Sequence, residues 1–138
     1  MLNFEQFQDP FNCKLKIRES NEIRERMIEL VESFNYLLGI HVKKMRQFQD
    51  NGRLYQVVLG EKNGKSIVIV WRPLNGLNGD TWALQRDRQF IEGIVLPALL
   101  GENTKLDRLL VNGDCYVPKA ESIEPEFRRL MSMERQNE

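Results

Sequence analysis

Two Asn-Gly pairs in the middle of the chain, Asn51-Gly52 and Asn63-Gly64, constrain its fold more than any other feature. Both residue types tolerate the positive φ that a tight β-hairpin turn requires. The segments around them are rich in the β-branched and aromatic residues that favour strands. The pattern predicts an antiparallel three-stranded meander over residues 40–72, with strands at about 41–48, 53–60 and 66–72.

Apolar residues recur at helical spacing on both sides of this meander. Before it, the spacing predicts a helix over residues 20–39, with Ser20 as a plausible N-cap. After it, the spacing predicts a second helix over residues 80–100, which includes Trp82 in its apolar pattern and which Pro97 kinks or ends. Two main helices are therefore expected to pack on the sheet.

Shorter elements are expected at the two ends of the chain. Residues 1–19 are expected to form an N-terminal arm with a short strand at about 13–17. Residues 107–133 are expected to form a further strand, a tight turn and a short C-terminal helix near 126–133. A length of 138 residues is typical of one domain. The sequence therefore predicts a single α+β domain over residues 1–138.

Charge is distributed unevenly, although the formal net charge is zero. Residues 1–39 carry a net charge of −2, residues 40–72 carry +5 and residues 73–138 carry −3. Such a basic segment can attract the phosphates of a nucleic acid, or it can form a solvated sheet face whose edge lysines discourage aggregation. The candidate phosphate contacts are Lys43, Lys44, Arg46, Arg53 and Arg72.

Aromatic residues interleave with these basic residues and have two interpretations. Tyr55 and Trp71 could stack on bases or pack in the core as cross-strand partners. Alternation along the strands favours the core, because Tyr55 shares a face with Val57 and Trp71 shares a face with Ile69. By the same alternation, Arg72 is expected to point the other way, toward solvent or a ligand.

Several kinds of catalytic site are excluded by the residue types present. His41 is the only histidine, which excludes paired-histidine schemes, and no Cys-x-x-Cys motif is present for a zinc knuckle. No glycine-rich phosphate loop of the required spacing occurs, and no Asp-x-Lys or Glu-x-Lys triplet falls on a predicted strand. Since neither a membrane-length apolar run nor a signal peptide is visible, a cytoplasmic protein without a membrane partner is expected.

Five blocks of sequence, taken in order, resemble one protein family. They are Asp9-Pro10-Phe11-Asn12 with Lys14-Leu15-Lys16-Ile17, residues 30–39, Val68-Ile69-Val70-Trp71-Arg72, Val111-Asn112-Gly113-Asp114-Cys115, and residues 123–131. In this order they resemble the C-terminal region of adenine-specific DNA methyltransferases that serve as modification subunits in type III restriction–modification systems. The resemblance covers nearly the whole chain. It implies DNA, and a methyltransferase catalytic domain or restriction subunit, as partners.

The chain departs from that family at the catalytic motifs. It has neither the Asp/Asn-Pro-Pro-Tyr/Phe tetrapeptide that stacks on a flipped adenine nor the Phe-x-Gly-x-Gly loop for S-adenosylmethionine. The sequence at Asp9-Pro10-Phe11 has a single proline. The resemblance therefore implies no catalytic residue and no cofactor in this chain, with S-adenosylmethionine expected only on a separate catalytic domain.

Three functions are compatible with these observations. The first is a non-catalytic accessory domain that aids DNA engagement or subunit assembly of an adenine DNA methyltransferase. The second is a protein-interaction module of a restriction–modification complex without direct DNA contact, docking through the apolar stripe of the first helix or through the N-terminal phenylalanines Phe4, Phe7 and Phe11. The third is an independent small enzyme, against which the missing motifs argue.

Overall fold

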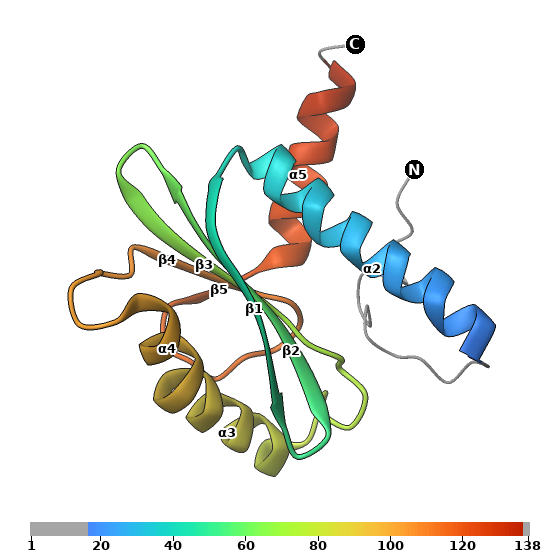
Figure 1. Ribbon diagram of the computed structural model, residues 1–138, viewed down its shortest axis with the longest axis vertical. Helices are drawn as coiled ribbons and strands as arrows, with labels where there is room; N and C mark the ends of the chain where they lie inside the picture. The colour runs from blue at the N-terminus through green and yellow to red at the C-terminus, as the bar shows by residue number, and fades with distance from the viewer. Residues whose placement is uncertain (1–16, 137–138) are drawn as a thin grey trace.

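The computed structural model describes the backbone of residues 17–136 and the side chains of residues 28–134. Its five strands form one mixed sheet in the order β1-β2-β3-β4-β5 (Figure 1). The first three strands are an antiparallel meander, and the last two run parallel to β3. The strands are β1 His41–Asp50, β2 Arg53–Lys62, β3 Lys65–Trp71, β4 Arg108–Val111 and β5 Ala120–Ser122. The predicted α+β class and meander are confirmed.

Both Asn-Gly pairs make the expected turns between strands of the meander. Asn51 has a φ of 52° and Asn63 has a φ of 54°, and the glycines after them have φ values of 78° and 77°. Two successive positive φ values match the twist of the flanking strands. The turns therefore fix the register that places Tyr55 opposite Phe48 and Val57 opposite Val70.

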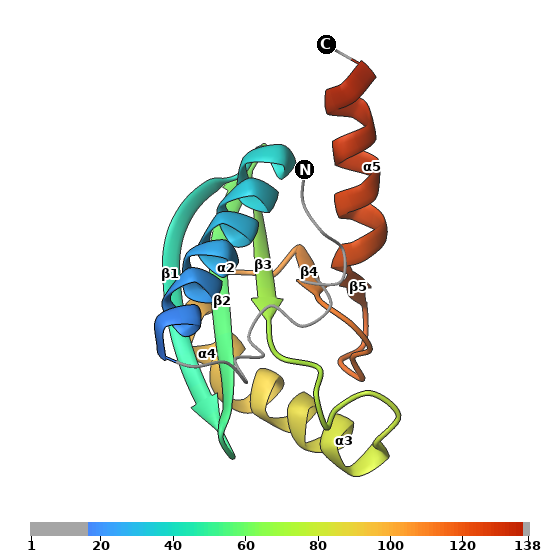
Figure 2. The same ribbon diagram turned by 90° about the vertical axis from the view of Figure 1, so that its right-hand side faces the viewer.

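Helices cover both faces of the sheet, so the molecule has three layers (Figures 1 and 2). One face carries α2 and α5, and the other carries a continuous helical stretch made of α3, the π-helical turn η1 and α4. Each face has its own apolar cluster. The bounds are α2 Ile17–Leu38, α3 Thr81–Phe90, η1 Ile91–Val95, α4 Leu96–Leu100 and α5 Ile123–Gln136.

Aromatic packing ties the helices to the sheet on each face. On the first face, the ring of Phe34 lies 5.8 Å from that of Trp71 in an edge-on geometry and 5.2 Å from that of Phe127. On the second face, the ring of Tyr55 lies 4.8 Å from that of Phe90. The expectation that Tyr55 and Trp71 pack in the core is therefore confirmed. The two residues lie on opposite faces of the sheet.

The structure corrects the start of the first helix. Ser20 lies inside α2, which begins at Ile17, so Ser20 is not an N-cap. The intervening Arg18 and Glu19 are good helix formers and extend the helix toward the N-terminus. Ile17, the end of the strand expected at 13–17, is helical, and the rest of that strand and the N-terminal arm up to residue 16 lie outside the described residues.

The second half of the chain also differs from expectation in detail. Pro97 does not end the second helix, because η1 precedes it and places it in the first turn of α4, where a missing N–H is tolerated. The C-terminal helix begins earlier than expected, at Ile123, with Pro125 in its first turn. The short strand β5 was not predicted. None of the described helices has the length and apolar composition needed to cross a membrane.

Candidate functional site

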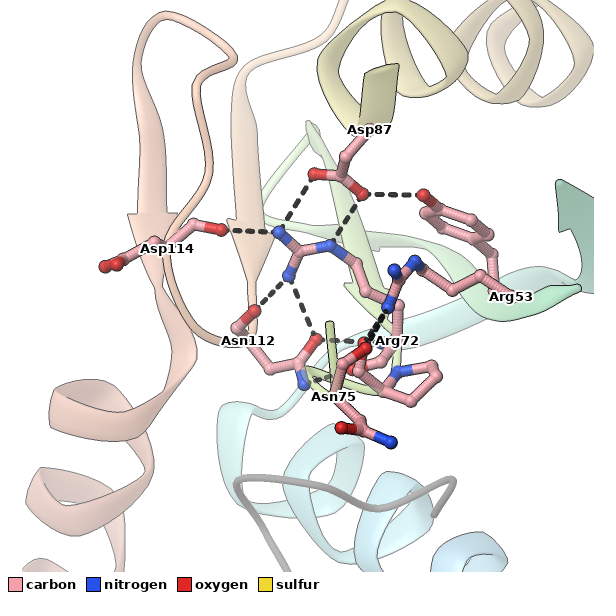
Figure 3. A network of polar contacts seen from close by, with 8 residues as sticks. Arg53, Arg72, Asn75, Asp87, Asn112 and Asp114 are labelled. Carbon is pink, nitrogen blue, oxygen red and sulfur yellow. Dashed lines mark hydrogen bonds and ion pairs between the residues drawn. The ribbon is translucent and has the colours of Figure 1, made fainter. Parts of the chain in front are cut away.

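A buried polar network lies where β3 and β4 end and α3 passes over them (Figure 3). Arg72 follows β3 directly, Asn112 follows β4 directly, and Asp87 comes from α3. All three residues are buried, and Arg72 has no exposed surface. The carboxyl ends of parallel strands are a common place for ligand sites in α/β sheets, so this cluster is the first candidate to consider.

Every N–H donor of the Arg72 guanidinium has a partner within the protein. Asp87 accepts from Nε at 2.8 Å and from Nη2 at 2.9 Å, in a two-pronged ion pair. Nη1 donates to the backbone and side-chain oxygens of Asn112, and Nη2 also donates to the backbone oxygen of Asp114. With five donors used and no exposed surface, Arg72 has no donor left for a ligand. The network is therefore a structural lock between the strand ends and α3.

Two more hydrogen bonds of Asn112 and one from Tyr55 complete this lock. The side chain of Asn112 accepts from the Arg72 backbone N–H at 2.8 Å and donates to the Arg72 carbonyl at 2.7 Å, which links the two strand ends beyond their last backbone pair. The hydroxyl of Tyr55 donates to Asp87 at 2.7 Å. Burial, and then the nearby Asp87 carboxylate, raise the pKa of Tyr55 well above its usual range, so the phenol stays protonated and remains a donor.

The expectation that Arg72 points to solvent or a ligand is wrong. Arg72 does lie on the face opposite Trp71, but that face is covered by α3, η1 and α4. Arg53 is also engaged, because its Nη1 donates to the carbonyl oxygens of Pro73 at 2.7 Å and Asn75 at 3.0 Å (Figure 3). Arg53 thus holds the loop that follows β3. Neither arginine lies with the remaining candidate phosphate contacts.

The other three candidates lie together on β1, the exposed edge strand. Lys43 is exposed and forms an ion pair with Glu61, whose pKa is lowered first by the hydrogen bond from Lys43 and then by its charge. Lys44 is exposed, and its Nζ lies 3.5 Å from the carbonyl oxygen of Leu99, a distance at the limit of a hydrogen bond. The guanidinium of Arg46 makes no hydrogen bond or ion pair with the described residues.

Lys44 and Arg46 project from the same face of the sheet. Their cross-strand partners, Leu59 and Val57, both belong to the apolar cluster under α3, η1 and α4. A β-bulge between Val42 and Lys44 sets Lys43 out of this alternation. The sequence pattern therefore gathers two cations on the α3 side of β1, and only Lys44 has a protein partner there.

A cleft adjoins this face where α3 meets the β1–β2 turn. It has a volume of about 660 Å³ and is lined by Asp50, Asn51, Trp82, Gln85, Arg86 and Gln89, among others. Trp82 is 84% exposed, which contradicts its place in the predicted apolar pattern. No local sequence pattern predicts this cleft, because its walls come from segments about 30 residues apart in the chain.

A second hollow, of about 500 Å³, lies at the other end of the meander beside Lys62, Lys65 and Arg108. Most of its positive charge is already engaged. Lys62 donates to the Leu38 carbonyl at 2.8 Å, and Arg108 forms ion pairs with two glutamates of β5 and α5. Within the described part of the chain, no three histidine, cysteine or acidic side chains gather as metal ligands would.

Comparison of the chain with protein-family models, with curated proteins and with solved structures found no match. The resemblance to methyltransferase C-terminal regions thus stays a prediction from the sequence.

Proposed function

We propose that this chain is a non-catalytic domain that binds DNA through one face of β1 and α3. In that role it assists a catalytic domain, encoded elsewhere, of an adenine-specific DNA methyltransferase. The observation that carries DNA binding is the pair of exposed cations on one face of β1, of which Arg46 has no protein partner among the described residues. The link to a methyltransferase depends on the order of the sequence blocks alone.

The charge of this face supports contact with phosphates. Lys44 and Arg46 are two residues apart on one strand, which spaces them by roughly 6.6 Å along β1. Arg86 on α3 adds a third positive group, although Asp50 pairs with it at 3.0 Å. Cations on an exposed strand contact phosphate oxygens without reading the sequence of bases. The proposed role is therefore engagement of the DNA backbone rather than recognition of a target site.

The protein-interaction alternative has less support from the structure. The described part of the α2 stripe is buried against the sheet and α5, through Leu30, Val31, Phe34 and Leu38. That surface is thus occupied within the chain itself. The N-terminal phenylalanines lie outside the described residues. One observation favours a role in subunit assembly: Tyr36, on the outer side of α2, is 76% exposed.

The proposal predicts salt-dependent binding that requires β1. Binding of a short labelled duplex is measured by fluorescence anisotropy across a salt series for the wild type and for the double variant Lys44→Gln/Arg46→Gln. Each lost phosphate contact lowers the slope of log Kd against log salt by about 0.9, so the double variant is expected to lose about 1.8. The affinity at low salt is expected to fall with it.

A matched control removes the same charge elsewhere. Lys105 and Lys119 lie on loops before β4 and β5, and Lys105→Gln/Lys119→Gln is expected to keep the slope of the wild type. A salt-independent Kd, no binding at all, or equal losses in the two double variants would each refute binding through β1.

A further inference from the structure

The geometry points to the cleft between α3 and the β1–β2 turn as a binding site for an unpaired base of DNA, with Trp82 as the stacking platform. This inference rests on the proposed function, because the basic face of β1 would bring the strand to the cleft. A base site in the cleft would give the protein a preference for unpaired over fully paired DNA. A backbone-binding face alone would have no such preference.

Trp82 is exposed without being loosely attached. It lies in the first turn of α3, whose N-cap Asp80 accepts from the backbone N–H of Ala83 at 3.1 Å. Leu84, two residues after Trp82, is buried with Leu74 and Leu77 in a small apolar cluster that anchors the start of the helix. An indole that is 84% exposed contributes little to the core. The backbone that carries Trp82 is therefore fixed by its neighbours, while the indole remains open to solvent.

Polar groups around the indole suit the edge of a base. Gln85 and Gln89 are exposed on α3 and line the cleft, and each amide offers both a donor and an acceptor. Arg86 is held in place by Asp50, with Nε–Oδ2 at 3.0 Å and Nη2–Oδ1 at 3.2 Å. That fork leaves its Nη1 donors free of partners among the described residues. Sites for single-stranded nucleic acid combine aromatic side chains that stack on bases with positive charge and with hydrogen bonds to base edges, and this cleft offers all three.

The size and place of the cleft fit the same occupant. Its volume of about 660 Å³ falls within the range of small-molecule sites. Arg46 and Asp50 are four residues apart on β1, so the proposed phosphate contact lies roughly 13 Å along the strand from the cleft wall. A DNA strand that follows β1 toward its turn would bring a neighbouring nucleotide to Trp82.

The two tryptophans make the test direct. Trp71 is fully buried and Trp82 is largely exposed, so acrylamide quenches the emission of Trp82 selectively. We expect an oligothymidine, or a duplex carrying one bulged base, to quench this accessible emission and protect it from acrylamide. A fully paired hairpin of the same length is expected to bind without doing either. Equal responses to paired and unpaired DNA would overturn the inference.

Substitution of the indole provides the second arm. Trp82→Ala is expected to weaken binding of the bulged duplex by about 5- to 150-fold, the loss expected for one base–aromatic stack. Trp82→Phe is expected to retain most of the affinity. Thermal unfolding of each variant should match the wild type, since the side chain is exposed. Unchanged affinity of Trp82→Ala for the bulged duplex would overturn the inference.

The two proposals fail in different ways. If the wild type binds the paired hairpin with a steep salt dependence but Trp82 does not respond to unpaired DNA, only the base site is refuted. If the wild type binds neither DNA at low salt, the DNA-binding proposal fails, and the base site fails with it.

Discussion

Asp87→Asn is expected to lower the free energy of unfolding by about 3–5 kcal/mol, the usual cost of removing one partner of a buried ion pair. Arg72 has no exposed surface, and two of its five donors point to the Asp87 carboxylate. Asparagine leaves the guanidinium charge buried without a counter-charge. It also replaces an acceptor oxygen with an NH₂ group. Urea unfolding followed by circular dichroism measures the change.

Two further variants separate the buried charge from a general loss of packing. The double variant Arg72→Met/Asp87→Leu removes both charges and is expected to cost less than the sum of the two single changes. Glu92→Gln breaks the exposed ion pair with Arg88 on the same helical stretch and is expected to cost at most about 0.5 kcal/mol. If Asp87→Asn costs no more than Glu92→Gln, the network is not a structural lock.

Phe34→Ala is expected to cost about 3–5 kcal/mol, the range for truncating a buried aromatic ring. Phe34 is fully buried in α2, and its ring contacts Trp71 of the sheet and Phe127 of α5. Its removal leaves a cavity where three elements meet. Chemical unfolding measures the loss. Tyr36→Ala, an exposed aromatic on the same helix, is the matched control and should change stability by no more than about 0.5 kcal/mol.

A loss for Phe34→Ala no larger than that for Tyr36→Ala would contradict the packing of α2 on this face. The same pair of variants bears on function. Because α2 lies on the opposite face from the Lys44 and Arg46 side chains, Tyr36→Ala should leave DNA binding unchanged.

The meander could be predicted because its signals are local. An Asn-Gly pair supplies positive φ at each of the two turns. The three strands that these turns join need no partner outside the meander to set their register. The further strand expected in residues 107–133 is confirmed as β4, but the parallel strand β5 could not be predicted in the same way. β5 has three residues and no β-branched or aromatic one, and its pairing with β4 depends on tertiary contacts.

The error at Arg72 has a specific physical cause. Alternation correctly places Arg72 and Trp71 on opposite faces of the sheet. The step from there to an exposed Arg72 holds only if the second face is in solvent. This sheet has an apolar core on each face. A signal for the second core was present in the sequence. Asp87 lies between Leu84 and Ile91 at helical spacing, so an acidic residue occupies the buried stripe of α3 and requires a buried cation.

Exposure of Trp82 was not predictable from periodicity. A tryptophan at a helical position counts toward an apolar stripe wherever it lies, and only the packing of Leu84 and Asp87 shows that the buried side of α3 is elsewhere. Exposure of the basic residues of β1 could be predicted, since an edge strand that carries lysines is expected to face solvent. The candidate site thus combines the basic face of β1, which the sequence predicts, with the cleft beside Trp82, which only the fold creates.

The proposed DNA interface is tested most directly by mapping it on the protein. A ¹⁵N-labelled chain is titrated with a short duplex at low salt, and the backbone amide shifts are followed residue by residue. We predict that the largest changes lie in β1 and in α3, at residues 41–50 and 81–90. Changes confined to α2 and α5, or no change at saturating DNA, would contradict DNA binding through this face.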